Sequence, residues 1–196
     1  MAKKNLPDFH FKPDPTRADP MKVFHLTGLQ RRRIFKWALY GLLVLAALLV
    51  QDTMLSRIQI SGATTDLVAC VILLIGILEG PEDGGLFALL GSTFYCLSGS
   101  APGVYVIVLL TAVSIFGALF RQGYWSQGLS STLLCTGLAL LVYEVGLMAI
   151  GIFLNLTVWN RLGVFILTAL LSTVALLPLY PVVRVIGQIG GEPWKE

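Results

Sequence analysis

Six stretches of apolar residues, separated by short polar breaks, fill most of the chain. They cover approximately residues 34–50, 63–78, 84–97, 104–120, 129–154 and 162–183. None of them carries polar residues at the helical spacing that is typical of a soluble amphipathic helix. Because a helix satisfies its own backbone hydrogen bonds at lipid depth, the pattern predicts an all-α integral membrane protein with six transmembrane helices.

The break between the second and third stretches has the most distinctive sequence, Glu79-Gly-Pro-Glu-Asp-Gly-Gly85. A Gly-Pro pair followed by Gly-Gly predicts a turn. The three carboxylates Glu79, Glu82 and Asp83 indicate contact with water. We therefore expect a helical hairpin whose tip is a solvated, acidic docking site for a partner.

The two arms of this hairpin are short for a membrane. Twelve to sixteen residues cover only about 18–24 Å at the rise of an α-helix, against a hydrocarbon thickness of ~30 Å. Either the helices extend beyond the apolar stretches or the other four spans shield the hairpin. The second arm has a face of small residues that favours close helix packing. That face comprises Gly84, Ala88, Gly91 and Ser92, followed by Tyr95.

Composition supports the membrane interpretation and indicates three regions along the chain. Hydrophobic residues make up 56% of the chain and charged residues 13%, about half the charged fraction of an average soluble domain. We expect a cytoplasmic N-terminal arm over residues 1–33, proline-rich and partly disordered, a six-helix domain over residues 34–184, and a cytoplasmic tail over residues 185–196.

Positive charge predicts the orientation. Nine of the fourteen Lys and Arg residues precede residue 37, and Arg121, Arg184 and Lys195 fall on the same side of a six-span layout. Only Arg57 and Arg161 fall on the other side. Both termini are therefore expected in the cytoplasm, together with the acidic turn, which Arg121 and Arg184 are placed to contact.

The basic run Arg31-Arg32-Arg33 precedes the first span. It is a short interfacial helix, the positive flank that orients the protein, or a site for a cytoskeletal or lipid partner.

Two carboxylates fall within the apolar stretches. Glu144 lies near the middle of the fifth stretch, where an ionised carboxylate is costly, so it must be protonated, partnered or in a wet cavity. Gly137, Glu144 and Gly151 repeat every seven residues, which predicts a helix contact within the fold or with a partner's span. A proton-carrying or ligand-binding role is the alternative. Asp66, at the start of the second stretch and near the outer interface, is a helix cap, a topology anchor that reaches the interface or pairs with Arg57 or Arg161, or a functional site.

We find no pattern that indicates catalysis. The sequence has no Ser/His/Asp or Cys/His arrangement, no His/Cys/carboxylate cluster at metal-ligand spacing and no phosphate-binding glycine loop. Three cysteines inside apolar stretches are better explained as packing residues. We expect no enzyme activity, no cofactor, no metal and no nucleic-acid partner.

Three segments in order resemble the rod shape-determining MreD family. They are Gln51 to Val68, the acidic turn continuing to Gly91, and Tyr95-Cys-Leu-Ser-Gly-Ser-Ala-Pro-Gly103. The resemblance covers about residues 40–185 and includes the length and the six-span layout. The chain departs from the family pattern at Thr65, where the family usually has Pro, and at Tyr95, where it usually has Asp.

The resemblance implies a non-enzymatic scaffold in the bacterial inner membrane that supports lateral peptidoglycan synthesis and rod shape. It implies a periplasm-facing MreC-type partner, with MreB filaments and the RodA and penicillin-binding synthase pair as further partners beside membrane lipid. It also implies a fold similar to that of the substrate-binding subunits of energy-coupling-factor transporters. The competing hypothesis is such a subunit itself, which would bind a vitamin or small solute.

Overall fold

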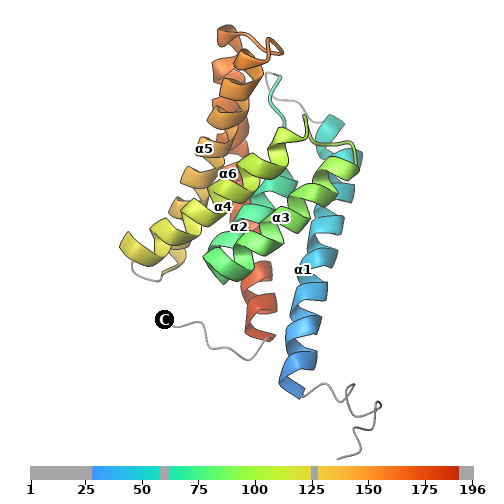
Figure 1. Ribbon diagram of the computed structural model, residues 1–196. Coiled ribbons are helices and arrows are strands. Elements are labelled where there is room, and N and C mark those ends of the chain that lie inside the picture. The colour runs from blue at the N-terminus through green and yellow to red at the C-terminus, as the bar shows by residue number, and fades with distance from the viewer. Residues whose placement is uncertain (1–27, 58–61, 125–127, 190–196) are drawn as a thin grey trace, which may run out of the picture.

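The computed structural model describes residues 28–57, 62–124 and 128–189, and it consists mainly of helices (Figure 1). Within that part of the chain, six α-helices occupy the six predicted stretches. They are α1 (Gly28–Thr53), α2 (Leu67–Glu79), α3 (Pro81–Leu97), α4 (Tyr105–Tyr124), α5 (Leu129–Phe153) and α6 (Leu162–Ile189). Two short 3₁₀ helices, η2 (Leu55–Arg57) and η3 (Trp159–Arg161), precede α2 and α6.

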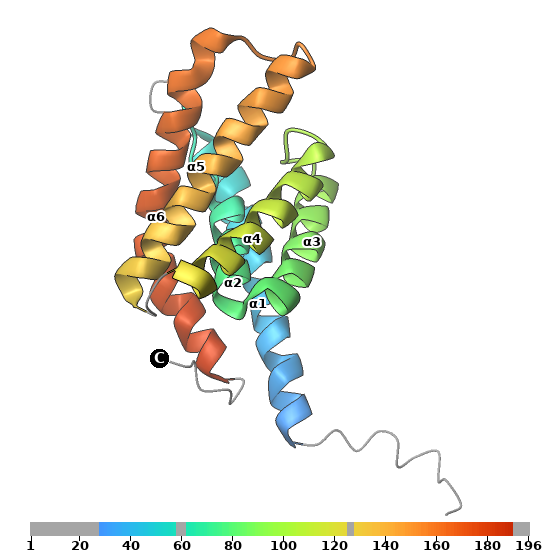
Figure 2. The same ribbon diagram turned by 60° about the vertical axis from the view of Figure 1, so that its left-hand side comes forward.

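The helices run alternately up and down a single bundle (Figure 2). The start of α1, the α2–α3 turn at Gly80, the end of α4 and the end of α6 lie at one end, which we call the Gly80 end. The α3–α4 and α5–α6 connections lie at the opposite end. This alternation is the one that the predicted orientation requires.

Four of the helices are long and apolar enough to span a membrane, so the chain is a membrane protein. The qualifying segments lie in α1, α4, α5 and α6. The other two are shorter: α2 has 13 residues and α3 has 17, which correspond to about 20 Å and 26 Å of helix.

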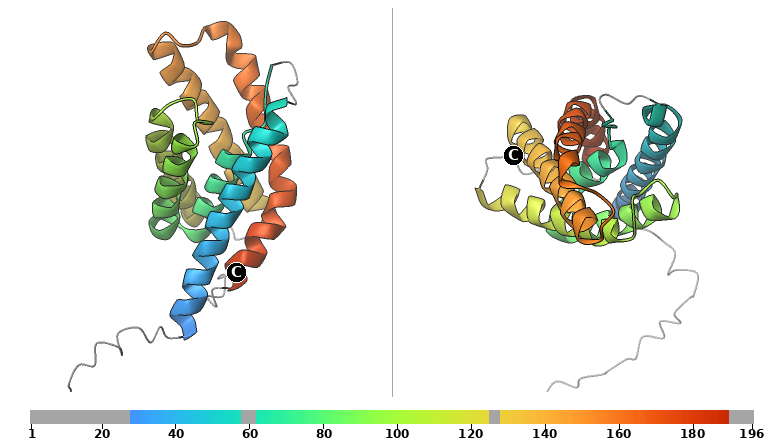
Figure 3. Two further views of the ribbon diagram at one scale, coloured as in Figure 1. Left: turned by 90° about the vertical axis from the view of Figure 1, so that its right-hand side faces the viewer. Right: turned by 90° about the horizontal axis from the view of Figure 1, so that it is seen from above.

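The short helix α2 lies in the middle of the bundle, where it contacts every other α-helix (Figure 3). All its residues from Val68 to Leu78 are buried. A helix that is apolar on every side is stable only when it is surrounded. The expectation that the other helices shield the short hairpin is therefore confirmed for α2, whereas α3 keeps one face exposed through Leu86, Leu90 and Phe94.

The small face of α3 packs on α2, as predicted. A Cβ added to Gly84 would overlap the backbone carbonyl of Gly76 and approach its Cα within 2.8 Å. Gly91 packs in the same way against the Ile72 side chain, and Ala88 and Ser92 are fully buried. The absence of a side chain at Gly84 lets the two backbones touch, and at Gly91 it leaves room for the Ile72 side chain.

The repeat along α5 is also a contact within the fold. Gly137 faces Thr173 of α6, where an added Cβ would lie 3.1 Å from the threonine methyl group. Gly151 faces Thr157 in the following connection. These two glycines therefore pack α5 against its own neighbours rather than against another protein.

Three predicted boundaries are wrong. The acidic turn is a single residue, Gly80, whose φ of 99° favours glycine, and Pro81 already begins α3, because proline fits the first turn of a helix. Helix α1 begins at Gly28, so the last residues of the predicted arm are helical, whereas residues 1–27 lie outside the described part. Helix α6 continues through Pro178 and Pro181 and past the predicted end of the sixth stretch at residue 183, to Ile189, which membrane helices tolerate when neighbouring groups satisfy the freed carbonyls.

Candidate functional site

The residues predicted to bind partners separate into an exposed group at the Gly80 end and a buried group inside the bundle. Five of them lie near the surface at the Gly80 end, and we call these the charged platform: Arg31, Arg32, Arg33, Glu82 and Asp83. The other three, Asp66, Glu79 and Glu144, have side chains that other parts of the protein cover.

Glu79 is not part of a solvated tip. Its carboxylate accepts one hydrogen bond from Lys36 Nζ and one from the Tyr40 hydroxyl, each at 2.7 Å. The Lys36 and Glu79 side chains are only 7% and 9% exposed. A carboxylate at the C-terminal end of a helix is unfavourable by itself, so the α1 cation offsets that effect and fastens α1 to the end of α2.

The rest of the acidic turn stays accessible. Asp83 pairs with Arg33 at 2.7 Å, and these side chains are 43% and 55% exposed. Glu82 is exposed beside it, in the first turn of α3, where a negative charge is favourable. Arg31 and Arg32 are exposed at the start of α1. The charged platform therefore joins two helices while leaving charges of both signs toward solvent.

Arg121 reaches the turn region, but through the backbone. Its Nη1 donates to the Ile77 carbonyl at 3.1 Å, one of the last carbonyls of α2, which have no partner within the helix. Sequence reasoning expected Arg121 to pair with the acidic residues. The structure shows it capping α2 from α4 instead.

Asp66 begins α2 as its N-cap. Its Oδ1 accepts from the Ala69 amide at 3.0 Å, and its Oδ2 accepts from the Tyr95 hydroxyl at 3.3 Å. Its own amide donates to Ser172 Oγ of α6 at 3.0 Å. The capping interpretation is confirmed, and among the described residues no ion pair joins Asp66 to Arg57 or Arg161, which are both exposed.

Gln51 of α1 completes the cluster. Its Nε2 donates to the Tyr95 hydroxyl at 3.2 Å, while its Oε1 accepts from the Val68 amide at 2.9 Å. Tyr95, where the resemblance leads us to expect Asp, thus links α3 to Asp66 and to α1. Helices α1, α3 and α6 together satisfy the polar groups at the start of the central helix.

We predict that Asp66→Ala destabilises the protein by about 1–2 kcal/mol, the usual effect of losing an N-cap. For a domain of this size the apparent Tm in mild detergent then falls by about 2–8 °C. Asp66→Asn keeps an oxygen for the Ala69 amide and an amide group for Tyr95, so its Tm is expected to stay close to that of the wild type. Equal losses for Ala and Asn would show that Asp66 acts through its charge and not as a cap.

Glu144 is buried within the bundle, with 3% of its surface exposed. Among the described residues no hydrogen bond or ion pair to its side chain is found, and the neighbouring Tyr143 hydroxyl is also buried without a partner. Its position excludes a direct surface contact with a partner's span. The alternatives of a proton-carrying or ligand-binding group stay open.

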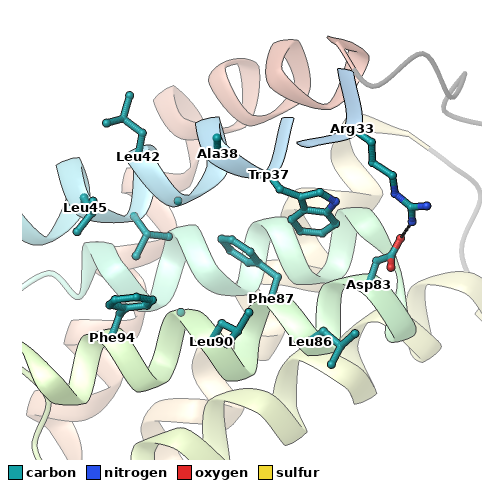
Figure 4. A pocket seen from close by; sticks show the side chains of 13 residues that line it. Arg33, Trp37, Ala38, Leu42, Leu45, Asp83, Leu86, Phe87, Leu90 and Phe94 are labelled. Atoms are coloured by element: carbon teal, nitrogen blue, oxygen red, sulfur yellow. Dashed lines mark hydrogen bonds and ion pairs between the residues drawn. The ribbon is translucent and has the colours of Figure 1, made fainter. Parts of the chain in front are cut away.

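An apolar groove runs between α1 and α3, which contact each other only sparsely. The groove has a volume of about 710 Å³. Trp37 and Leu42 line one wall, and Leu86 and Leu90 line the other (Figure 4). At one end of the groove lies the Arg33–Asp83 pair, which belongs to the charged platform.

Sequence reasoning missed Lys36, Tyr40, Gln51 and Ser172. Lys36 and Tyr40 are four residues apart and therefore on one face of α1. Two hydrogen-bond donors on one face are a pattern from which a shared acidic partner could have been predicted. Nothing in the local sequence marks Gln51 or Ser172, because their partners lie on other helices.

The described residues contain no group of three or more His, Cys, Asp and Glu side chains that could hold a metal ion. Cys70, Cys96 and Cys135 are free thiols. No family model, curated protein or solved structure matches the chain. The function must therefore be argued from the residues and their geometry.

Proposed function

We propose that the protein is a non-enzymatic scaffold of the bacterial cell-elongation complex, similar to the MreD family, and that it crosses the inner membrane six times with both termini in the cytoplasm. The resemblance supports this because its three segments contribute to one structural unit. They supply the Asp66 cap, the Gly80 turn, the Gly84 contact and the Tyr95 link around the central helix. Scaffolding requires such a rigid centre and accessible groups at its periphery.

The observation that carries the proposal is the charged platform. Lys36 and Tyr40 hold α1 to Glu79, and Arg33 pairs with Asp83 across the α1–α3 boundary. These contacts fix the geometry of the platform, while Arg31, Arg32 and Glu82 stay exposed. A fixed surface of both charges at the membrane boundary suits electrostatic recognition of a protein partner such as an MreB filament.

The energy-coupling-factor type of solute-binding subunit is the second candidate. The observations that favour it are the buried Tyr143 hydroxyl, which has no hydrogen-bond partner among the described residues, and the burial of Glu144, the next residue of α5, because a ligand that donates and accepts hydrogen bonds would satisfy such groups. Against it, Asp66, Tyr95 and Gln51 already satisfy one another. The scaffold therefore remains the better supported function.

Purification in mild detergent from a rod-shaped bacterial host tests the scaffold. We expect an MreC-type protein and other elongation proteins to copurify, and we expect cells depleted of this protein to become round. Recovery of an ATPase module with its coupling protein, or of a bound vitamin, would instead identify a transporter subunit.

The charged platform is tested by Glu82→Lys together with Asp83→Lys. Reversal of both charges is expected to reduce copurified cytoplasmic partner about tenfold, which corresponds to about 1.4 kcal/mol of binding free energy. Membrane insertion is expected to be unchanged. Asn160→Lys, an exposed change at the opposite end, serves as the control. Unchanged partner recovery and unchanged cell shape would restrict the turn to a structural role.

A further inference from the structure

The groove between α1 and α3 is an unfilled apolar surface at membrane depth. Its walls expose large side chains, with Leu42 62%, Leu86 64% and Leu90 60% exposed. Its floor includes Gly41 and Gly91. A Cβ added to Gly41 would meet no atom within 4 Å, so the protein itself leaves this space open.

The length of the groove corresponds to one leaflet of a bilayer. It follows α1 from Arg33 to Leu45, a helical distance of about 18 Å. Half of the ~30 Å hydrocarbon core is ~15 Å. A partner's transmembrane helix would need a contact surface along the whole core, whereas a lipid chain needs one leaflet only.

The chemistry of the two ends differs in the same way as that of a phospholipid. The far end, beside Leu45 and Phe94, is apolar. The near end has Arg33, whose Nη2 bonds Asp83 while more than half of its side chain remains exposed, and the exposed Arg31 and Arg32 adjoin it. Arginine forms paired hydrogen bonds with phosphate oxygens.

Aromatic rings mark the boundary between these ends. Trp37 packs against Phe87 with ring centroids 5.7 Å apart, next to Arg33 along the groove (Figure 4). Tryptophan is enriched at the level of lipid headgroups. The Arg33 end therefore corresponds to the headgroup region of the leaflet on the Gly80 side.

We propose that this groove binds one anionic glycerophospholipid. Its acyl chains lie between α1 and α3, and its phosphate lies against Arg33 and Arg32. The three arginines outnumber the two carboxylates of the charged platform, so the local charge favours an anionic headgroup over a zwitterionic one. The lipid would hold α1 and α3 at their observed separation.

The proposal is tested on the purified protein in vesicles, with Trp37 as the reporter. Trp125, Trp159 and Trp194 are replaced by Phe, and bromine-labelled phosphatidylglycerol or phosphatidylcholine is the quencher. We expect phosphatidylglycerol to quench Trp37 at a lower mole fraction than phosphatidylcholine does. The difference is expected to be about fivefold for each arginine that contacts the phosphate. Arg32→Gln with Arg33→Gln is expected to abolish this preference and leave quenching by phosphatidylcholine unchanged.

Gly41→Leu places a side chain in the groove at a position where an added Cβ meets no atom within 4 Å, and it is expected to weaken quenching by both lipids. Gly163→Leu, at another glycine with no atom near its Cβ position, is the matched control and is expected to have no effect. Equal quenching of the unsubstituted Trp37 reporter by the two lipids, or undiminished quenching in Gly41→Leu, overturns the proposal. A separate crosslinking experiment in cells tests for occupation by a protein: a crosslink from a photoreactive residue at position 41 to a stoichiometric protein partner also overturns the proposal.

This experiment uses no elongation protein, so its failure leaves the scaffold proposal intact. Conversely, loss of the scaffold function in cells would not affect the lipid preference measured in vesicles.

Discussion

Gly84→Ala is expected to destabilise the folded protein by about 3 kcal/mol or more, because the added Cβ overlaps the backbone of Gly76. Overpacking usually costs about 1–3 kcal/mol when side chains can move aside. Here the obstacle is the main chain of the central helix, which every other helix holds in place. The apparent Tm in mild detergent should fall by about 6–12 °C.

Two other glycines provide a graded comparison. A Cβ at Gly76 meets chiefly the Ser114 side chain, which can rotate, so Gly76→Ala should lower Tm less than Gly84→Ala. Gly163 has no atom near its Cβ position, so Gly163→Ala should be neutral or stabilising by up to about 1 kcal/mol through helix propensity. Size-exclusion profiles of the tagged proteins in solubilised membranes extend the test to a variant too unstable to purify. Equal Tm values for all three variants would contradict the α2–α3 contact.

The helices themselves were predictable from the sequence. Each apolar stretch forms one α-helix, because a continuous apolar stretch at lipid depth has no other way to satisfy its backbone. The small face of α3 was predictable for a related reason. Residues at three- and four-residue spacing share a helix face, so Gly84 and Gly91 were expected to meet the same neighbour, which proves to be α2.

The pairing of the acidic residues was not predictable in the same way. Glu79 and Asp83 are both next to a glycine-rich turn. From the sequence alone, the same basic residues are candidate ion-pair partners for both carboxylates. Only the packing of α1 against α2 decides that Lys36 covers Glu79, across 43 positions, whereas Arg33 meets Asp83 at the surface. Long-range geometry, rather than local composition, made one carboxylate buried and the other exposed.

The helix boundaries show a similar limit. The sequence marks Gly80 to Gly85 as a breaker region, but Gly84 and Gly85 are helical because each lies against a neighbouring helix with no room for a side chain. At these two positions packing, and not backbone freedom, requires glycine. Only Gly80, with its positive φ, acts as the turn residue that the pattern predicted.

Loss of the Lys36 cation is expected to have an effect as large as the Gly84 clash. Lys36→Met leaves the Glu79 carboxylate buried with Tyr40 as its remaining described side-chain donor, and breaking a buried ion pair costs about 3–5 kcal/mol. The apparent Tm should fall by about 6–20 °C. Arg31 to Arg33 still precede the first span, so the orientation in the membrane is expected to be retained.

A double-mutant cycle separates the buried charge from the other effects of the change. Lys36→Met with Glu79→Gln removes both charges and keeps an acceptor for the Tyr40 hydroxyl, so most of the lost stability should return. Arg33→Met breaks the exposed pair with Asp83 and should cost at most about 1 kcal/mol. If the double variant is as unstable as Lys36→Met alone, the lysine stabilises the bundle through its ammonium group over the Trp37 ring, 5.4 Å from the ring centroid, and not through the pair with Glu79. If instead Arg33→Met is the more damaging change, α1 is held by the exposed pair, and the buried contact with Glu79 does not fasten α1 to the central helix.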